Sequence, residues 1–202
     1  MIHDSLQLIV NELNAALKGN NSEDPVFLGN IAQVESGTSE AEKQVVLSLV
    51  NVEEESSLKN GPHHRLKDGK VVYENRPVHL SLYLLFSANH KNYATALKRL
   101  EAIITFLQGK NVFTARAAPD LQKLSRTPEE LAGFRMSLEL FSLSFEQINH
   151  LWGSLGGKQV PFILYRARLV SLSAEEIQRS GPPITQISID SEDTFAASAH
   201  AR

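Results

Sequence analysis

A change of hydrophobic period between Arg76 and Gly109 constrains the fold more than any other feature of this sequence. Apolar residues first occupy every second position, which predicts a strand with one face in a core. These residues are Val78, Leu80, Leu82, Leu84, Phe86 and Ala88. After Asn89 the spacing changes to three and four residues, which predicts an amphipathic helix. The helical stripe consists of Tyr93, Ala96, Leu97, Leu100, Ile103, Ile104 and Leu107. Gly109 is expected to cap that helix at its C-terminus.

The junction between this strand and this helix carries no recognisable chemistry. Many α/β enzymes place a phosphate-binding loop or a nucleophile at such a turn. The junction here reads Ser-Ala-Asn-His-Lys over residues 87–91, which supplies neither. The segment is therefore interpreted as scaffold, and the function is expected to lie in the surface of the protein.

The N-terminal part of the chain predicts one helix followed by two strands. An apolar stripe indicates a helix over residues 2–18, and a strand is expected to begin at Val26 and run on through Val34. Residues 44–53 are apolar on both faces, which predicts a central strand. Residues 54–75 are polar and are predicted to form a long irregular loop, with one hairpin arm turning at residues 68–69.

The C-terminal part predicts further strands and one capped helix. Strands are expected over residues 134–143 and 162–172, with a short edge strand over 184–189 and a helical turn over 127–130. Ser144 and Gln147 fit a capping box. The helix that it begins is expected to direct five apolar residues inward. These are Phe145, Ile148, Leu151, Trp152 and Leu155.

This element order predicts an α+β fold with a single mixed, mostly antiparallel sheet and helices packed on it. The strands alternate cleanly, so one face of the sheet is expected to stay open to solvent or to a partner. We expect one domain over residues 1–190, and a small, polar and disordered tail over residues 191–202.

Composition excludes several classes of protein. The 202 residues contain no cysteine, which excludes disulfides and thiolate metal sites and favours a reducing compartment. The net charge of −3 argues against nucleic acid as a partner. No apolar stretch approaches the roughly 20 residues that span a bilayer, so no membrane partner is expected. Residues 1–4 do not resemble the start of a secretory signal.

Two candidate sites are outweighed by simpler interpretations. His63 and His64, with His79 and His90, could in principle bind a metal, but no carboxylate lies at the usual spacing, so a solvated polar loop is favoured. Residues 153–158 resemble a phosphate loop, but they lack its spacing and follow a helix. The sequence therefore predicts no catalytic residue, no metal, no cofactor and no enzyme activity.

Basic residues on the predicted loop and on outward strand faces are the candidate partner contacts. They are His63, His64, Arg65, Lys67, Arg135, Arg166 and Arg168.

Five segments resemble a known family by their motifs, order and spacing. In chain order these are the opening helix, the Leu-Lys-Asn of residues 58–60, residues 80–88 with the helix that follows, residues 143–155 and residues 164–170. The chain resembles, over about residues 1 to 190, the tail-terminator or cap proteins of phage-tail-like extracellular contractile injection systems of the antifeeding-prophage and virulence-cassette type.

The resemblance implies a tail-terminator-like fold and a structural role. Such proteins form a homohexameric ring that caps the distal end of the inner tube and anchors the last sheath layer. The implied partners are the protein itself, the tube protein and the sheath protein. The implied location is the bacterial cytoplasm during assembly and then the injection particle. Two alternatives stay open at this point: a metal-dependent enzyme with a histidine-lined loop, and a free-standing adaptor of unknown partner.

Overall fold

The chain folds into helices and strands in nearly the predicted order. A computed structural model describes residues 2–19, 25–33, 44–55, 64–67, 70–74, 78–114, 134–172 and 177–181. In chain order these residues form α1 (Ile2–Leu17), β1 (Val26–Leu28), the 3₁₀ helix η1 (Ile31–Gln33), β2 (Val45–Glu54), β3 (His64–Lys67), β4 (Lys70–Glu74), β5 (Val78–Ala88), α2 (Tyr93–Gly109), β6 (Val112–Thr114), β7 (Arg135–Leu140), α3 (Phe145–Ser154), β8 (Phe162–Leu172) and β9 (Ile177–Gly181).

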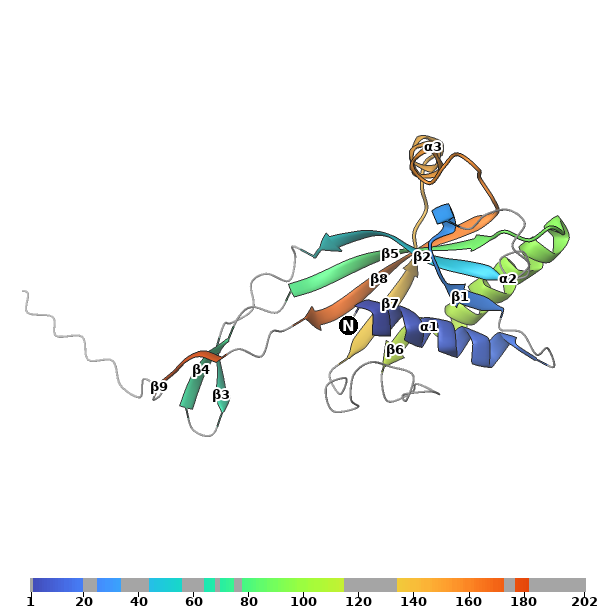
Figure 1. Cartoon of the computed structure of the whole chain (residues 1–202). Coiled ribbons are helices and arrows are strands. Elements are labelled where there is room, and N and C mark those ends of the chain that lie inside the picture. The colour runs from blue at the N-terminus through green and yellow to red at the C-terminus, as the bar shows by residue number, and fades with distance from the viewer. Residues whose placement is uncertain are drawn as a thin grey trace, which may run out of the picture. The chain divides into compact units, whose positions relative to one another are not determined.

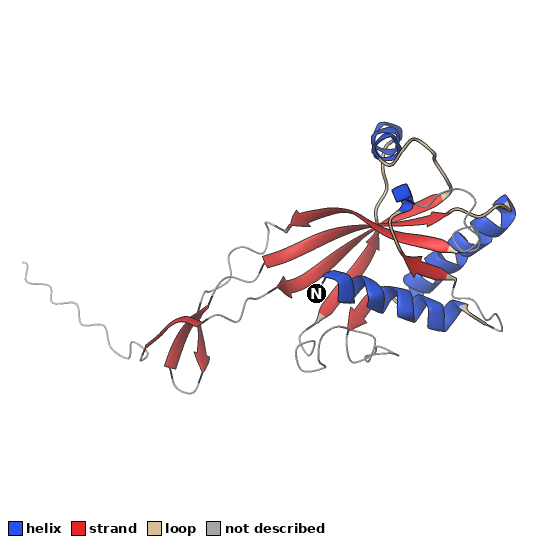
Figure 2. Cartoon of the chain, in the orientation of Figure 1, coloured by secondary structure: helices blue, strands red, loops and turns tan. Residues whose placement is uncertain are grey.

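Six of the described strands form one sheet in the order β1-β2-β5-β8-β7-β6 (Figure 1). β1 runs parallel to β2, and every other neighbouring pair in this sheet is antiparallel. The predicted α+β fold with a mixed, mostly antiparallel sheet is confirmed. Figure 2 shows α1 and α2 on one side of this sheet, and α3 and η1 on the other.

The main core lies between the sheet and helices α1 and α2. The even-numbered residues of β5 from Leu80 onward enter this core, as their alternation predicted, and Leu82, Leu84 and Phe86 are fully buried there. Ile9 and Leu13 of α1 reach the same core. Burying a large apolar side chain contributes roughly 1.5–3 kcal/mol, so this face provides most of the stability.

A smaller core lies on the opposite face, under α3 and η1. It is built around Leu85, Leu164 and Trp152. The predicted capping box begins α3: the Ser144 backbone N–H donates to Gln147 Oε1 at 2.9 Å, and the Gln147 N–H donates to Ser144 Oγ at 3.3 Å. Leu143 and Ile148 flank the cap and pack together in this smaller core as a hydrophobic staple.

An asparagine side chain joins α1 to the first strand. Asn14 Nδ2 donates to the Val26 carbonyl at 2.8 Å, and Asn14 Oδ1 accepts from the Val26 N–H at 2.9 Å. The Asn14 amide thereby pairs with both backbone polar groups of the first residue of β1. Burial of those two groups without a partner would cost free energy, so this contact fixes where α1 ends against the sheet.

A buried ion pair joins α1 to the C-terminal end of α2. Glu12 is 5% exposed and pairs with Lys110. Lys110 is also the C-cap of α2, and its backbone N–H donates to the carbonyl of Phe106. Removing either partner would leave a charge poorly compensated, which makes this contact specific to the native packing of α1 on α2.

The chain divides into two compact units. One comprises residues 1–60 and 77–173 and holds the six-stranded sheet; the other comprises residues 61–76 and 174–202. In the second unit β3, β4 and β9 form an antiparallel three-stranded sheet. The predicted hairpin is confirmed, since Lys67 pairs with Lys70 across residues 68–69. The prediction that residues 54–75 are otherwise irregular was wrong, because β3 and β4 lie within them.

The first edge strand is shorter than predicted. β1 ends at Leu28, and Ile31 lies in η1 instead of continuing the strand. The Ser48 hydroxyl of β2 explains the change. It donates to the Gly29 carbonyl at 2.7 Å and accepts from the Ile31 N–H at 3.0 Å, so a side chain replaces the backbone ladder beyond the Gly29 N–H, which still donates to the Leu47 carbonyl.

Five apolar residues predicted to face inward, or to continue a core alternation, are exposed instead. They are Val78, Tyr93, Leu97, Leu140 and Phe145. Val78 begins β5, the next two lie on the first turn and a half of α2, and the last two flank the connection from β7 to α3. Each lies at or near the end of its helix or strand, where the apolar pattern extends beyond the layer that would cover it.

The prediction that Gly109 caps α2 was wrong. Gly109 is the last residue of α2, and the cap is Lys110 in an extended conformation.

Two short strands were not predicted. β6 and β9 lie in segments for which the sequence predicts no strand. The helical turn expected at 127–130, the edge strand expected at 184–189 and the tail from 191 lie outside the described residues. The prediction of one domain ending at residue 190 therefore stays a prediction.

Candidate functional site

Part of the sheet face opposite α1 and α2 is polar, and two rows of side chains cross it. In one row Asn51 of β2 pairs with Tyr83 of β5, which pairs with Arg166 of β8, which pairs with Glu139 of β7. In the next row Glu53, Ser81, Arg168 and Ser137 are opposite one another in the same order. Because residues on one face of neighbouring strands are in direct reach, these side chains interact across the sheet.

The carboxylate of Glu139 is shared by two arginines. Arg166 Nε donates to Glu139 Oε1 at 2.5 Å, and its Nη2 donates to the same oxygen. Arg168 Nη2 lies 3.4 Å from that oxygen. The hydrogen bond to Glu139 raises the pKa of the Arg166 guanidinium above its ordinary value. Arg166 is therefore a permanent cation with a fixed orientation.

Aromatic rings support this ion pair. The Arg166 guanidinium lies 5.9 Å from the centroid of the Phe141 ring, a cation–π contact. The Phe141 ring meets Tyr83 edge to face, with centroids 5.2 Å apart. The Tyr83 hydroxyl donates to Glu53 Oε2 at 2.9 Å. Burial raises the pKa of the Tyr83 phenol, and the bond to Glu53 raises it further.

We name the surface formed by Glu53, Tyr83, Glu139, Arg166 and Arg168 the polar sheet face. Its charged groups remain accessible: the side chains of Arg166, Glu139 and Arg168 are 27%, 45% and 51% exposed. The polar groups of this surface satisfy one another, and none of them is held as a nucleophile beside a base. Such an arrangement suits recognition of a charged protein surface better than catalysis.

The structure brings three of the predicted contact residues together. Arg135, Arg166 and Arg168 lie on one face of the neighbouring strands β7 and β8. His64, Arg65 and Lys67 lie in β3, in the other compact unit, where the structure describes the backbone. His63 lies outside the described residues. The prediction that these seven residues contact a partner is not tested by the structure.

Sequence reasoning missed the acidic and aromatic members of the polar sheet face. Glu139 lies in the strand predicted over residues 134–143, but its partner could not be known without the register of β7 on β8. Glu53 lies at the end of the strand predicted over residues 44–53. Opposite charges at outward positions of two predicted strands were the available signal.

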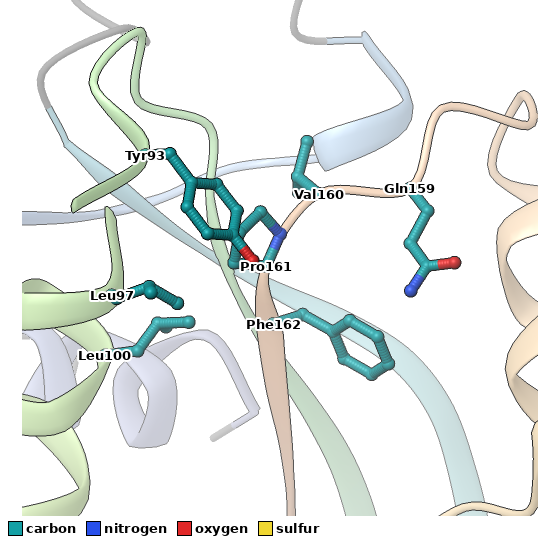
Figure 3. A pocket seen from close by; sticks show the side chains of 7 residues that line it. All are labelled: Tyr93, Leu97, Leu100, Gln159, Val160, Pro161 and Phe162. Atoms are coloured by element: carbon teal, nitrogen blue, oxygen red, sulfur yellow. The ribbon is translucent and has the colours of Figure 1, made fainter. Parts of the chain in front are cut away.

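A shallow apolar groove lies beside the N-terminal end of α2 (Figure 3). It has a volume of about 530 Å³ and is lined by Tyr93, Leu97, Leu100, Gln159, Val160, Pro161 and Phe162. Figure 3 shows the α2 side chains on one side and the segment that leads into β8 on the other. We name it the α2 groove. Tyr93 and Leu97 are 65% and 46% exposed, so the groove presents apolar surface to solvent.

The described residues contain no cluster of three or more His, Asp or Glu side chains with the geometry of a metal site. None of the helices in this part of the chain is both long enough and apolar enough to cross a membrane.

Two solved structures share this fold. One is the sheath/tube terminator, in the extended state, of the extracellular contractile injection system PVC, with a TM-score of 0.60 and 17% identity. The other is the tube-terminating cap of the anti-feeding prophage, with a TM-score of 0.54 and 11% identity. The matches cover 98% and 93% of this chain, but 65% and 59% of those chains. The chain thus spans less than two thirds of either protein.

A comparison with curated proteins gives no match. The family model of the Pvc16 N-terminal domain, in contrast, matches residues 6–186, which include all thirteen described helices and strands except the first residues of α1. The chain therefore belongs to the Pvc16 N-terminal domain family.

Proposed function

We propose that this chain is a terminator subunit, which assembles into a ring and closes the distal end of the tube and sheath of a contractile injection particle. The observation that carries this proposal is the family match over residues 6–186, together with the fold shared with a sheath/tube terminator and with a tube-terminating cap. The proposed ring is a homohexamer, its proposed partners are tube and sheath proteins, and it has no enzymatic activity.

A ring of identical subunits needs two different contact surfaces on each subunit, because each copy meets its neighbours head to tail. The polar sheet face is one candidate. Its exposed Arg168 and Glu139 can exchange partners across an interface without leaving a buried charge unpaired. As a further part of this proposal, the subunit assembles in the bacterial cytoplasm and then remains in the injection particle.

The second compact unit is the other candidate contact element. Its described part is a three-stranded sheet of 4, 5 and 5 residues. A sheet of this size buries little apolar surface, and small sheets need a hydrophobic face packed against another element to be stable. A partner that packs against β3, β4 and β9 would contribute the missing stability. We propose that this arm recognises the tube, the sheath or a neighbouring subunit.

Electron microscopy tests the proposal directly. The purified protein, alone or with its tube protein, should form hollow rings, and mass photometry should find a species of about six subunits. A strict monomer under both conditions would contradict ring formation. It would leave the adaptor as the better interpretation. Metal that co-purifies tightly and is lost on His63→Ala would favour the enzyme alternative instead.

A second experiment separates the arm from the core. Replacing residues 61–76 by a Gly-Ser linker removes β3 and β4 and leaves the six-stranded sheet intact. The melting temperature of the six-stranded unit should stay within a few degrees of wild type, while particles assembled with the variant should have tubes or sheaths of uncontrolled length. Particles of normal, uniform length would show that the arm is dispensable for termination.

A further inference from the structure

Phe145 is the most exposed large apolar residue in the described part of the chain, at 93%. The fold of the subunit does not require it. The start of α3 is fixed by the capping box of Ser144 and Gln147 and by the staple of Leu143 and Ile148. An exposed aromatic side chain on a backbone that a helix cap already fixes is typical of a binding anchor, because no further backbone freedom is lost when it binds.

The α2 groove is a concave apolar surface on the same compact unit. Tyr93 and Leu97 form one wall, and Val160, Pro161 and Phe162 form the other (Figure 3). An apolar projection and an apolar groove on one subunit are the two halves of a heterologous contact, which repeats from copy to copy.

The charges around the α2 groove favour a second copy of this chain as its occupant. Residues 89–100 and 157–162, which include the groove lining, contain four Lys or Arg residues and no Asp or Glu. Lys98 and Lys158 among them are exposed. The residue that follows Phe145 is Glu146, an exposed carboxylate in the first turn of α3. The aromatic and acidic pair at the start of α3 therefore complements the apolar and basic groove in both shape and charge.

We infer that the α2 groove binds the Phe145–Glu146 end of α3 from a second copy of this chain. In this contact the Phe145 ring lies between Leu97 and Val160, and Glu146 approaches Lys158 or Lys98. The inference rests on the proposed ring, and it adds one specific contact between neighbouring subunits to the two candidate surfaces named above.

Disulfide trapping tests this contact, because the chain has no cysteine of its own. The double variant Phe145→Cys, Val160→Cys should form intermolecular disulfides on mild oxidation, under conditions where wild type forms rings. A denaturing, non-reducing gel should show a ladder of covalent oligomers. The matched control is Phe145→Cys, Val78→Cys, because Val78 is 40% exposed at the opposite end of β5 from the strand's junction with α2. It should give no ladder.

A charge exchange tests the acidic and basic pairing. Phe145→Ala and Glu146→Lys should each weaken subunit association by about 10-fold to 100-fold, as loss of an interface anchor does, with an unchanged melting temperature. Adding Lys158→Glu to Glu146→Lys should restore most of the loss. Glu101→Lys makes the same charge change at an exposed carboxylate of α2 that does not line the groove, and it should have no effect.

The outcomes separate this contact from the proposed function. Rings of wild-type size that give no 145–160 ladder, or that tolerate Phe145→Ala, would overturn the contact while terminator function stands. If groove substitutions impair only the binding of tube or sheath protein, the occupant is that protein and the inference is wrong. A wild-type protein that never oligomerises would overturn the proposed ring and this contact together.

Discussion

The two faces of the six-stranded sheet have different compositions, and β5 carries both of them. Its even-numbered residues meet α1 and α2 and are buried from Leu82 to Ala88. Its odd-numbered residues change along the strand: Leu85 is buried under α3, Tyr83 is half-buried, and Ser81 hydrogen-bonds to Glu55. One face provides the stability of the subunit. The other is only partly covered by α3 and η1, and its polar part is available for contact.

The largest expected effect comes from the helix-covered face. Phe86 is fully buried and meets Tyr165 edge to face at 5.9 Å. Phe86→Ala should lower the free energy of unfolding by about 3–5 kcal/mol, since a large cavity forms in tightly packed surroundings. Urea denaturation followed by circular dichroism measures the change. A loss below 1 kcal/mol would mean that this face is not the main source of stability.

Trp152 tests the smaller core on the opposite face. It is 4% exposed and contacts Phe162 edge to face at 5.4 Å. Trp152→Ala should cost about 3 kcal/mol, at the low end for a buried tryptophan, because α3 can move toward the sheet and fill part of the cavity. As the only tryptophan, Trp152 also reports its own environment. Fluorescence typical of water exposure in wild type would contradict its burial.

The polar sheet face should separate stability from assembly. Glu139→Gln removes the charge that Arg166 and Arg168 share, but these groups are partly exposed, so the cost in stability should be about 1 kcal/mol or less. The same change should weaken the association of subunits into rings or particles more than it lowers the stability of the monomer. A thermal melt with parallel mass photometry compares the two. Equal losses in both would show that this face serves the fold alone.

The smallest effect is a dependence on alkaline pH. The pKa of Tyr83 is raised by burial and by Glu53, so folding favours the protonated phenol. Its contribution to stability is therefore complete below about pH 10 and is lost as the pH rises through the higher folded pKa. Tyr83→Phe should reduce the loss of stability above that pH. The same alkaline dependence in wild type and variant would assign it to Tyr165, whose pKa burial also raises.

The sequence was most informative where one short segment determines its own structure. The alternation of β5 and the Ser144 capping box depend on residues within one strand or one turn, and both are confirmed. The ion pairs of the polar sheet face depend on the register of four strands, which no local pattern contains. Phe145 was placed inward because helical spacing continues its stripe, but the first residue of α3 lies beyond the smaller core. The short strands β6 and β9 are each paired with a strand that is distant in the sequence, so their local residues alone do not reveal them.

The contact between Asn14 and Val26 has a consequence for how this sheet can grow. An edge strand with free N–H and C=O groups is a template on which another chain can add a strand. At Val26 both groups are already bound by the Asn14 amide. The margin at β1 is thus closed at that residue as soon as α1 packs on the sheet. A subunit whose proposed task is to end a polymer therefore has, at Val26 of this edge strand, no free backbone group to which another strand could bind.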